Sequence, residues 1–190
     1  MIIGLTGPTG SGKSEISSYL KEKGFFIIDS DEIVRRLYVD CDECIDTIGK
    51  SFENVVENNG VNKRNLAKIV WNDKHSLLKL CEIVNPYILN KIKTEIKLRD
   101  CDNIIIDAPT LFESGAYRLC DYSLAILSKK QIRLRRILNR DNIKYDDAMA
   151  RIDSQPKDDF YIEHADEIVF NNNKLSDCIS SVECILHKWL

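Results

Sequence analysis

Short apolar runs alternate with longer amphipathic stretches along the chain. The runs predict β-strands at residues 2–6, 25–29, 103–107, 122–127 and 167–170. The stretches between several of these runs carry apolar residues at helical spacing. Strands that alternate with helices are typical of a parallel sheet, because a parallel connection needs a crossover element. The pattern therefore predicts an α/β fold in which helices lie on both faces of a parallel sheet.

The stretch from residue 32 to residue 99 is too long for a single crossover helix. Its apolar residues recur at helical spacing, and we expect Pro86 at the start of a helix. Residues 58–60, Asn-Asn-Gly, predict a turn between helices. We interpret residues 32–99 as a helical insertion that covers an acceptor substrate, within a single domain of residues 1–190. A last amphipathic helix is predicted at residues 175–189, with its core face formed by Cys178, Ile179, Val182, Ile185, Leu186 and Trp189.

The loop after the first predicted strand carries the strongest functional signal. Residues 7–14 read Gly-Pro-Thr-Gly-Ser-Gly-Lys-Ser and match G-x-x-x-x-G-K-[ST], the phosphate-binding P-loop. Glycines let backbone N–H groups surround phosphate oxygens, and the positive end of the following helix faces the same anion. Lys13 would reach the β- and γ-phosphates, and the Ser14 hydroxyl would hold Mg²⁺. The alternative is a glycine-rich turn that binds nothing, which the strand before it and the helix after it disfavour.

Acidic side chains follow two of the predicted strands. Asp29 and Asp31 come at the end of the second strand, and Asp107 ends the third. Ligands of open parallel sheets bind at the carboxyl ends of the strands, so we expect these acids near the P-loop. We predict that Asp29 or Ser30 caps the next helix and that Asp31 orients the acceptor hydroxyl and takes its proton. Asp107 resembles the acid of a Walker-B strand, which supports Mg²⁺, although ordinary strands also end in Asp.

Basic side chains concentrate in one helical segment, at Arg133, Arg135, Arg136 and Arg140. Arg136 and Arg140 are four residues apart and share one helix face. Small kinases close an arginine-bearing lid over the transferring phosphoryl group, and we predict this role for Arg140 in a lid of residues 129–160. For Arg133 and Arg135 we favour the alternative, a solvated basic face that pairs with the nearby acids Asp141, Asp146 and Asp147.

Charge and composition narrow the classes of function. The chain has 190 residues and a net charge of −3, which argues against a general nucleic-acid binder, since such proteins carry a broad basic surface. No apolar run approaches the roughly 20 residues of a membrane span. In the insertion, Arg35 and Arg64 either meet an anionic acceptor or are ordinary surface charges.

Seven cysteines raise the question of disulfides or a metal site. Cys41 and Cys44 form one C-x-x-C motif, but no second pair or neighbouring histidine accompanies it, whereas a structural zinc site needs four ligands. An odd number of cysteines beside a nucleotide site indicates reduced thiols and a cytoplasmic protein. We also expect no signal peptide, because the first strand runs directly into the P-loop.

Taken in order, these motifs resemble the dephospho-CoA kinase family over nearly the whole chain. The family's D-x-D motif and the arginine that follows it are residues 29–31 and Arg35. Its D-x-P-L-L-F-E motif corresponds to residues 107–113, and its R-x-x-x-R-D lid motif to residues 136–141. An R-I-x-x-Q motif follows at residues 151–155, and a closing Ala-Asp pair with a later Asn is Ala165, Asp166 and Asn171.

This resemblance implies transfer of the γ-phosphoryl group of ATP to the 3′-hydroxyl of dephospho-CoA in the presence of Mg²⁺. It implies catalytic roles for Asp31, Lys13 and Arg140. It implies ATP contacts from Thr9, Gly10, Ser11, Gly12, Lys13, Ser14, Glu15, Arg136 and Asn171, with Ser14 also on the metal. It implies contacts with the acceptor from Asp29, Arg35, Arg64 and Asp107. It requires no nucleic acid, no membrane and no second copy of the chain.

The chain departs from the family pattern at several positions. Asn85 stands where the family has the histidine of a His-Pro pair, and Glu15 stands where it has a threonine after the P-loop serine. A carboxylate at position 15 would weaken contact with the α-phosphate unless it points to solvent. Neither departure removes a residue that phosphoryl transfer requires.

Two other functions stay open at the level of sequence. A nucleoside monophosphate or small-metabolite kinase would share the P-loop and the lid, although the D-x-D motif and the long insertion favour the first interpretation. A non-catalytic nucleotide-binding regulator is the other alternative. The chain lacks the N/T-K-x-D element with which GTP switches read guanine, and a regulator needs no lid arginines.

Overall fold

The computed structural model describes residues 1–70, 73–99 and 103–189. The chain divides into two compact units. We call Met1–Ile28 with Cys101–Leu190 the sheet unit, and Asp29–Asp100 the helical unit. The predicted insertion of residues 32–99 lies within the helical unit. The description of the chain as a single domain with an insertion stays a prediction.

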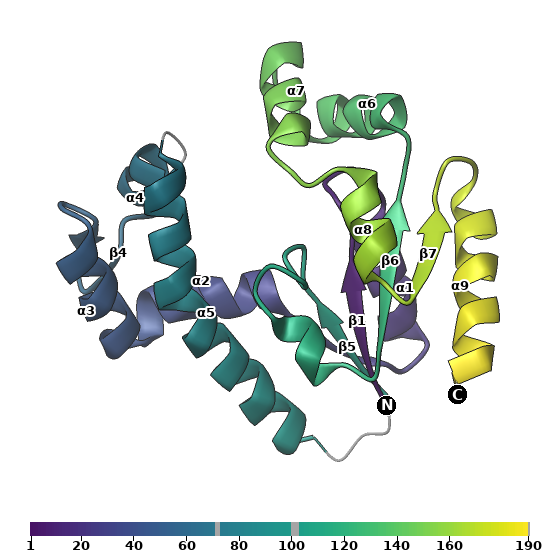
Figure 1. The fold of residues 1–190 in the computed structure, drawn as a ribbon, viewed down its shortest axis with the longest axis horizontal. Coiled ribbons are helices and arrows are strands. Elements are labelled where there is room, and N and C mark those ends of the chain that lie inside the picture. The colour runs from purple at the N-terminus through teal and green to yellow at the C-terminus, as the bar shows by residue number, and fades with distance from the viewer. Residues whose placement is uncertain (71–72, 100–102, 190) are drawn as a thin grey trace. The chain divides into compact units, whose positions relative to one another are not determined.

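A five-stranded parallel sheet forms the centre of the sheet unit, as Figure 1 shows. Its strands, in spatial order, are β2 (Phe26–Asp29), β5 (Ile104–Asp107), β1 (Ile2–Thr6), β6 (Tyr122–Leu127) and β7 (Glu167–Phe170). All the predicted strands are confirmed, with β2 and β5 each beginning one residue later than expected. The central strands are buried on both faces, which explains why they are continuously apolar rather than alternating.

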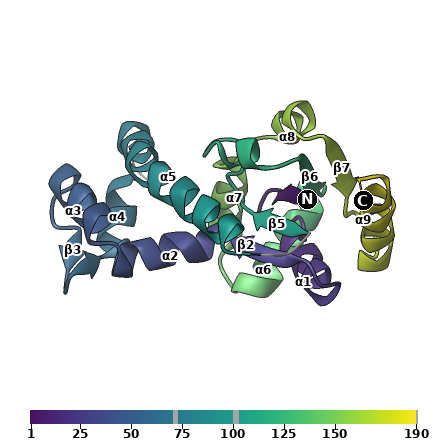
Figure 2. The ribbon, with the colours of Figure 1, turned by 90° about the horizontal axis from the view of Figure 1, so that it is seen from below.

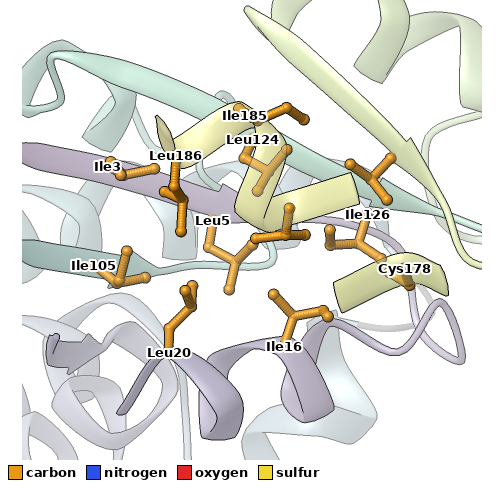
Figure 3. Close-up of a cluster of buried hydrophobic side chains, with 12 residues drawn as sticks. Ile3, Leu5, Ile16, Leu20, Ile105, Leu124, Ile126, Cys178, Ile185 and Leu186 are labelled. Carbon is orange, nitrogen blue, oxygen red and sulfur yellow. The ribbon is translucent and has the colours of Figure 1, made fainter. Parts of the chain in front are cut away.

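Helices from both ends of the sheet unit cover one face of this sheet. Side chains of α1 (Lys13–Glu22) and α9 (Leu175–Trp189) meet those of β1, β5 and β6 in one buried cluster, drawn in Figure 3. The predicted core face of α9 is confirmed, because Cys178, Val182, Ile185 and Leu186 are buried in this cluster and Ile179 and Trp189 pack against it. This packing fixes the start of α1, and therefore the P-loop, on the end of β1.

The segment between β6 and β7 forms α6 (Lys130–Asp141), α7 (Tyr145–Asp153) and α8 (Asp158–His164). A second, smaller cluster holds α6 and α7 together through the buried side chains of Ile137, Ala148 and Ile152. A short 3₁₀-helix, η1 (Ala116–Leu119), precedes β6. The predicted lid region therefore contains a packed helical hairpin rather than an open loop.

The helical unit consists of α2 (Ser30–Asp40), α3 (Asp42–Ser51), α4 (Lys63–Val70) and α5 (Lys74–Lys97), together with β3 (Val56–Glu57) and β4 (Gly60–Val61). Figure 2 shows α3, α4 and the two short strands grouped at one end of α2 and α5. Within the described residues, no helix combines the length and the apolar character that crossing a membrane needs. Cys41 and Cys44, at the start of α3, are free thiols, whereas Cys101 lies outside the described residues.

The turn predicted between helices at residues 58–60 is confirmed, since it lies between α3 and α4, but it closes a β-hairpin that was not predicted. Val56 pairs with Val61 and Glu57 with Gly60 in an antiparallel ladder. Asn58 and Asn59 form the two-residue loop and have φ values of 49° and 60°. Two consecutive residues with positive φ give a turn whose twist matches that of a hairpin, and Asn tolerates this conformation. Strands as short as these leave no alternating pattern in the sequence.

The helix start predicted at Pro86 is wrong, because Pro86 lies inside α5. Buried apolar side chains continue at four-residue steps through the proline, at Leu80, Val84, Ile88 and Ile92. Proline removes one helical hydrogen bond, that to the carbonyl of Glu82. Both Pro86 and Glu82 are on the exposed side of α5, where water can satisfy this carbonyl. The buried stripe therefore holds the helix together across the proline.

Candidate active site

The P-loop lies between β1 and α1, as its sequence predicts. Its three glycines all have positive φ, 147° at Gly7, 78° at Gly10 and 98° at Gly12. A Cβ at Gly12 would lie 2.2 Å from Nδ2 of Asn171, and a Cβ at Gly10 would lie 2.8 Å from the carbonyl oxygen of Arg133. Side chains at these positions would therefore force the loop away from its neighbours. This glycine-lined loop, which leads into the first turn of α1, has the form that a polyphosphate needs.

Lys13 and Asp107 form an ion pair at the edge of the P-loop. Lys13 is the first residue of α1, and its Nζ donates to Oδ1 of Asp107. Asp107 is the last residue of β5 and pairs in register with Leu5 of β1, so the adjacent strands bring the two charges together. The side chains are 14% and 11% exposed, respectively. The structure therefore places Asp107 beside the P-loop, as expected, with Lys13 as its partner.

Arg136 and Asn171 hold the outer side of the P-loop. Nη1 of Arg136 donates to the carbonyl oxygens of Gly10 and Ser11, at 3.2 Å and 3.1 Å. Nδ2 of Asn171 donates to the same Ser11 oxygen at 2.9 Å, and Nη2 of Arg136 donates to the Asn171 carbonyl at 3.2 Å. These bonds turn the carbonyl groups outward, which leaves the amide groups of the loop to face a phosphate. Direct contact of Arg136 and Asn171 with ATP stays a prediction.

Arg140 lies at the end of α6 in an ion-pair network. Its Nε and Nη2 donate to the two oxygens of Asp141 at 2.6 Å and 3.0 Å, and Nη1 of Arg151 donates to Asp141 at 2.5 Å. These hydrogen bonds, chiefly that from Arg140, lower the pKa of Asp141 to about 2. The same bond raises the pKa of Arg140, and Glu15 adds a weaker attraction. Arg140 is 58% exposed, so its guanidinium is accessible from solvent; its lid role stays a prediction.

Arg133 corrects an expectation. We favoured a solvated position paired with Asp141, Asp146 or Asp147, but Arg133 is only 4% exposed. Its Nε donates to the carbonyl oxygen of Thr9 at 2.9 Å, and its Nη2 donates to Gln155 at 3.1 Å. For Arg135 the expected solvated position is confirmed, because its side chain is exposed, while its pairing with these acids stays a prediction. Sequence reasoning gave Arg133 no place at the P-loop and named Gln155 only as part of a family motif, because only the fold brings both side chains to Thr9.

The helical unit carries the residues predicted to serve the acceptor. Asp29 is the N-cap of α2, since its Oδ1 accepts from the N–H groups of Asp31 and Glu32 at 2.8 Å and 3.1 Å. The expectation that Asp29 or Ser30 caps the helix is therefore confirmed, with Asp29 as the cap. Asp31 is an exposed residue of the first turn. Arg35 bonds to Glu32 at 2.8 Å and lies 3.8 Å from Asp29. Arg64 is exposed in the first turn of α4.

A pocket of about 400 Å³ opens between α1 and α9, beside the predicted metal-binding Ser14. Two apolar side chains of α9 and polar side chains of α1 line it, namely Leu175 and Ile179, with Ser14, Glu15, Ser18, Tyr19 and Glu22. Mixed lining of this kind suits a small ligand that has both apolar and polar edges. Through Ser14 and Glu15 this pocket adjoins the P-loop.

Gly12→Ala is expected to weaken ATP binding roughly tenfold or more, because the new Cβ would displace Asn171 and break its hydrogen bond to the P-loop. Gly24→Ala is a matched control: Gly24 has a φ of 92°, close to the 98° of Gly12, but a Cβ there meets nothing within 4 Å. The control is expected to lose about 1 kcal/mol of stability from the backbone conformation alone and no ATP affinity. Calorimetric titration and urea unfolding measure both quantities. Equal ATP affinities of the two variants would contradict the role of Gly12.

Comparison with known proteins identifies the family. A family model described as dephospho-CoA kinase matches residues 1–177. A dephospho-CoA kinase of Fusobacterium nucleatum subsp. nucleatum is 39% identical over 188 residues, 96% of this chain and 95% of the relative. One of Carboxydothermus hydrogenoformans is 33% identical over 195 residues, 99% of this chain and 94% of the relative.

Solved structures agree with this assignment. A dephospho-CoA kinase from Campylobacter jejuni aligns with a TM-score of 0.71 at 25% identity, over 98% of this chain and 96% of that one. A Thermus thermophilus protein shares the fold with a TM-score of 0.85 at 24% identity, over 100% of this chain and 98% of that one. A shikimate kinase from Acinetobacter baumannii shares it with a TM-score of 0.58 at 15% identity, over 100% of this chain and 94% of that one. Since the family match spans nearly the whole chain and includes the P-loop and its basic neighbours, the chain belongs to the dephospho-CoA kinase family, whose members are ATP-dependent kinases acting on a hydroxyl group.

Proposed function

We propose that this protein transfers the γ-phosphoryl group of ATP to the 3′-hydroxyl of dephospho-CoA, giving CoA and ADP. The observation that carries the proposal is the glycine-lined P-loop with the Lys13–Asp107 pair at its edge, in a chain of this family. In the transfer, the bond between the γ-phosphorus and the bridging oxygen breaks, and a bond to the acceptor oxygen forms. The hydroxyl proton goes to a carboxylate, and ADP leaves.

The residues divide into three roles. Lys13 and the P-loop amides bind the β- and γ-phosphates, and Arg140 stabilises the charge that develops during transfer. Asp31 orients the acceptor hydroxyl and takes its proton. Arg35 and Arg64 attract the pyrophosphate of the acceptor, which a planar guanidinium binds through paired hydrogen bonds.

Oxygen ligands beside the P-loop suit Mg²⁺. Ser14 follows Lys13 in the first turn of α1, and the Asp107 carboxylate lies beside Lys13. No group of three or more His, Cys, Asp or Glu side chains among the described residues could hold a metal ion. This is consistent with a kinase magnesium that binds through one or two protein oxygens and the substrate phosphates. When bound, Mg²⁺ neutralises part of the phosphate charge.

An ATP-dependent assay with dephospho-CoA tests the proposal. We expect release of ADP with dephospho-CoA and none with CoA, whose 3′-hydroxyl already carries a phosphate. Nucleosides, nucleoside monophosphates and shikimate serve as alternative acceptors at equal concentration. Turnover that is faster with any of these acceptors would assign the chain to another kinase activity, and ATP binding without any turnover would favour a regulator. Action in the cytoplasm as a single chain is part of the proposal.

A further inference from the structure

Two side chains of the predicted lid region converge on one residue of the P-loop. The N–H group of Thr9 donates to Oε1 of Gln155 at 2.9 Å, and Nε of Arg133 donates to the carbonyl oxygen of Thr9 at 2.9 Å. Nη2 of Arg133 donates to the same Gln155 oxygen at 3.1 Å. Thr9, Gln155 and Arg133 therefore form a closed ring of hydrogen bonds, which we call the Thr9 clamp.

The charge of Arg133 makes the acceptors of the clamp important. Arg133 is only 4% exposed, and its Nη1 lies 3.9 Å from Oδ1 of its ion-pair partner Asp158. Burial lowers the pKa of Arg133, which the acid only partly offsets. A buried cation needs fixed acceptors for its N–H groups, and the Thr9 carbonyl and the Gln155 oxygen supply them. Because two donors point at Oε1, the carboxamide of Gln155 has only one favourable orientation.

The clamp fixes the peptide groups on both sides of Thr9. In a trans peptide, the carbonyl and the next N–H group point in opposite directions, and the described residues contain no cis peptide bond. Since Arg133 holds the carbonyl of Thr9, the N–H group of Gly10 is turned away from Arg133. Gly10 also lies against the backbone of Arg133, too close for a Cβ. The orientation of this amide in the phosphate cradle therefore depends on the clamp.

The clamp also joins the P-loop to both ends of a rigid helix pair. Arg133 is in the first turn of α6, and Gln155 follows the end of α7. Ile137, Ala148 and Ile152 pack these two helices together. A displacement of the α6–α7 pair relative to the P-loop must therefore stretch or break hydrogen bonds to Thr9.

We propose that Gln155 is a positioning residue for phosphoryl transfer: by accepting hydrogen bonds from Thr9 and Arg133, it sets the first peptide groups of the phosphate cradle and couples them to α6 and α7. The part of this inference that concerns turnover rests on the proposed function. The part that concerns nucleotide binding needs no acceptor substrate, because the cradle binds the phosphates of ATP.

Two substitutions at one position test the clamp. Gln155→Met keeps the length of the side chain and removes the acceptor. Gln155→Glu keeps an acceptor oxygen, and the Arg133 guanidinium offsets the added charge. We expect Gln155→Met to raise the KM for MgATP and the Kd of a non-hydrolysable ATP analogue roughly tenfold, on the scale of an unsatisfied buried donor. The KM for dephospho-CoA should change less than twofold. Gln155→Glu should recover at least half of the lost ATP affinity on a logarithmic scale.

Gln131→Met is the matched control, because Gln131 is exposed on α6 and the same change is made there. This control should leave the KM for MgATP, the KM for dephospho-CoA and the Kd of the ATP analogue unchanged. A Gln155→Met variant that only melts earlier, with an unchanged Kd for the analogue, would overturn the inference, as would equal losses in Gln155→Met and Gln155→Glu. If the wild-type protein fails to phosphorylate dephospho-CoA, the proposed function is wrong, but the Kd of the analogue still decides whether the clamp positions the cradle.

Discussion

Lys13→Met is expected to lower the rate of phosphoryl transfer by roughly a thousandfold, the upper range for removal of one preorganised donor from a developing charge. Lys13 is the P-loop lysine and the first residue of α1, where its ammonium group and the positive helix end would act on the same phosphates. Methionine keeps much of the length and packing of the lysine stem, so the loss is of charge. Steady-state kinetics with saturating ATP and dephospho-CoA measure the rate, and thermal unfolding checks the fold.

The ion pair with Asp107 requires a second control. Lys13→Met leaves a carboxylate that is 11% exposed without its ammonium partner, which is expected to lower stability by about 1–3 kcal/mol. The double variant Lys13→Met/Asp107→Asn removes this charge and should recover stability without recovering turnover. Lys21→Met makes the same change at an exposed position of α1 and should change neither the stability nor the turnover. Turnover of Lys13→Met within tenfold of the wild type would contradict the assignment.

The features that the sequence predicts well are those that local chemistry determines. The P-loop needs its glycines, lysine and serine at fixed spacing, and the strand and helix around it are short-range patterns. The strands of the sheet are buried on both faces, so each is recognisable as an apolar run. The capping role of Asp29 follows from its place before a helix. These predictions required no knowledge of residues distant in the chain.

The errors arise where distant residues decide the outcome. Arg133 has the sequence context of a surface residue, and its burial depends on the approach of Thr9 and Gln155, which are far away in sequence. Pro86 would begin a helix if local propensity decided, but packing of α5 on the rest of the helical unit overrides it. The hairpin of β3 and β4 is too short to show a period. In each case tertiary contact outweighs a local preference.

Asp29 and Asp31 lie two residues apart at the start of α2, and we propose different tasks for them. Oδ1 of Asp29 accepts two backbone hydrogen bonds and thereby fixes the first turn of the helix. Asparagine caps helices as well as aspartate does, so Asp29→Asn should leave the stability of α2 nearly unchanged. Asp31 is exposed in the turn that this cap orders. The cap fixes the backbone from which the Asp31 side chain extends, and a group that accepts a proton during transfer needs a positioned backbone.

Asp31→Asn is therefore expected to lower turnover at least about 100-fold, the scale of a lost general base, with little change in the affinity for MgATP. The amide keeps the shape of the carboxylate and can still accept a hydrogen bond from the acceptor, but it cannot take the proton. Asp40→Asn, at the other end of α2 and exposed, is the matched control and should keep normal turnover. Near-normal turnover of Asp31→Asn would mean that the acceptor hydroxyl loses its proton without a protein base, and the arginines and Lys13 would then account for catalysis through charge alone.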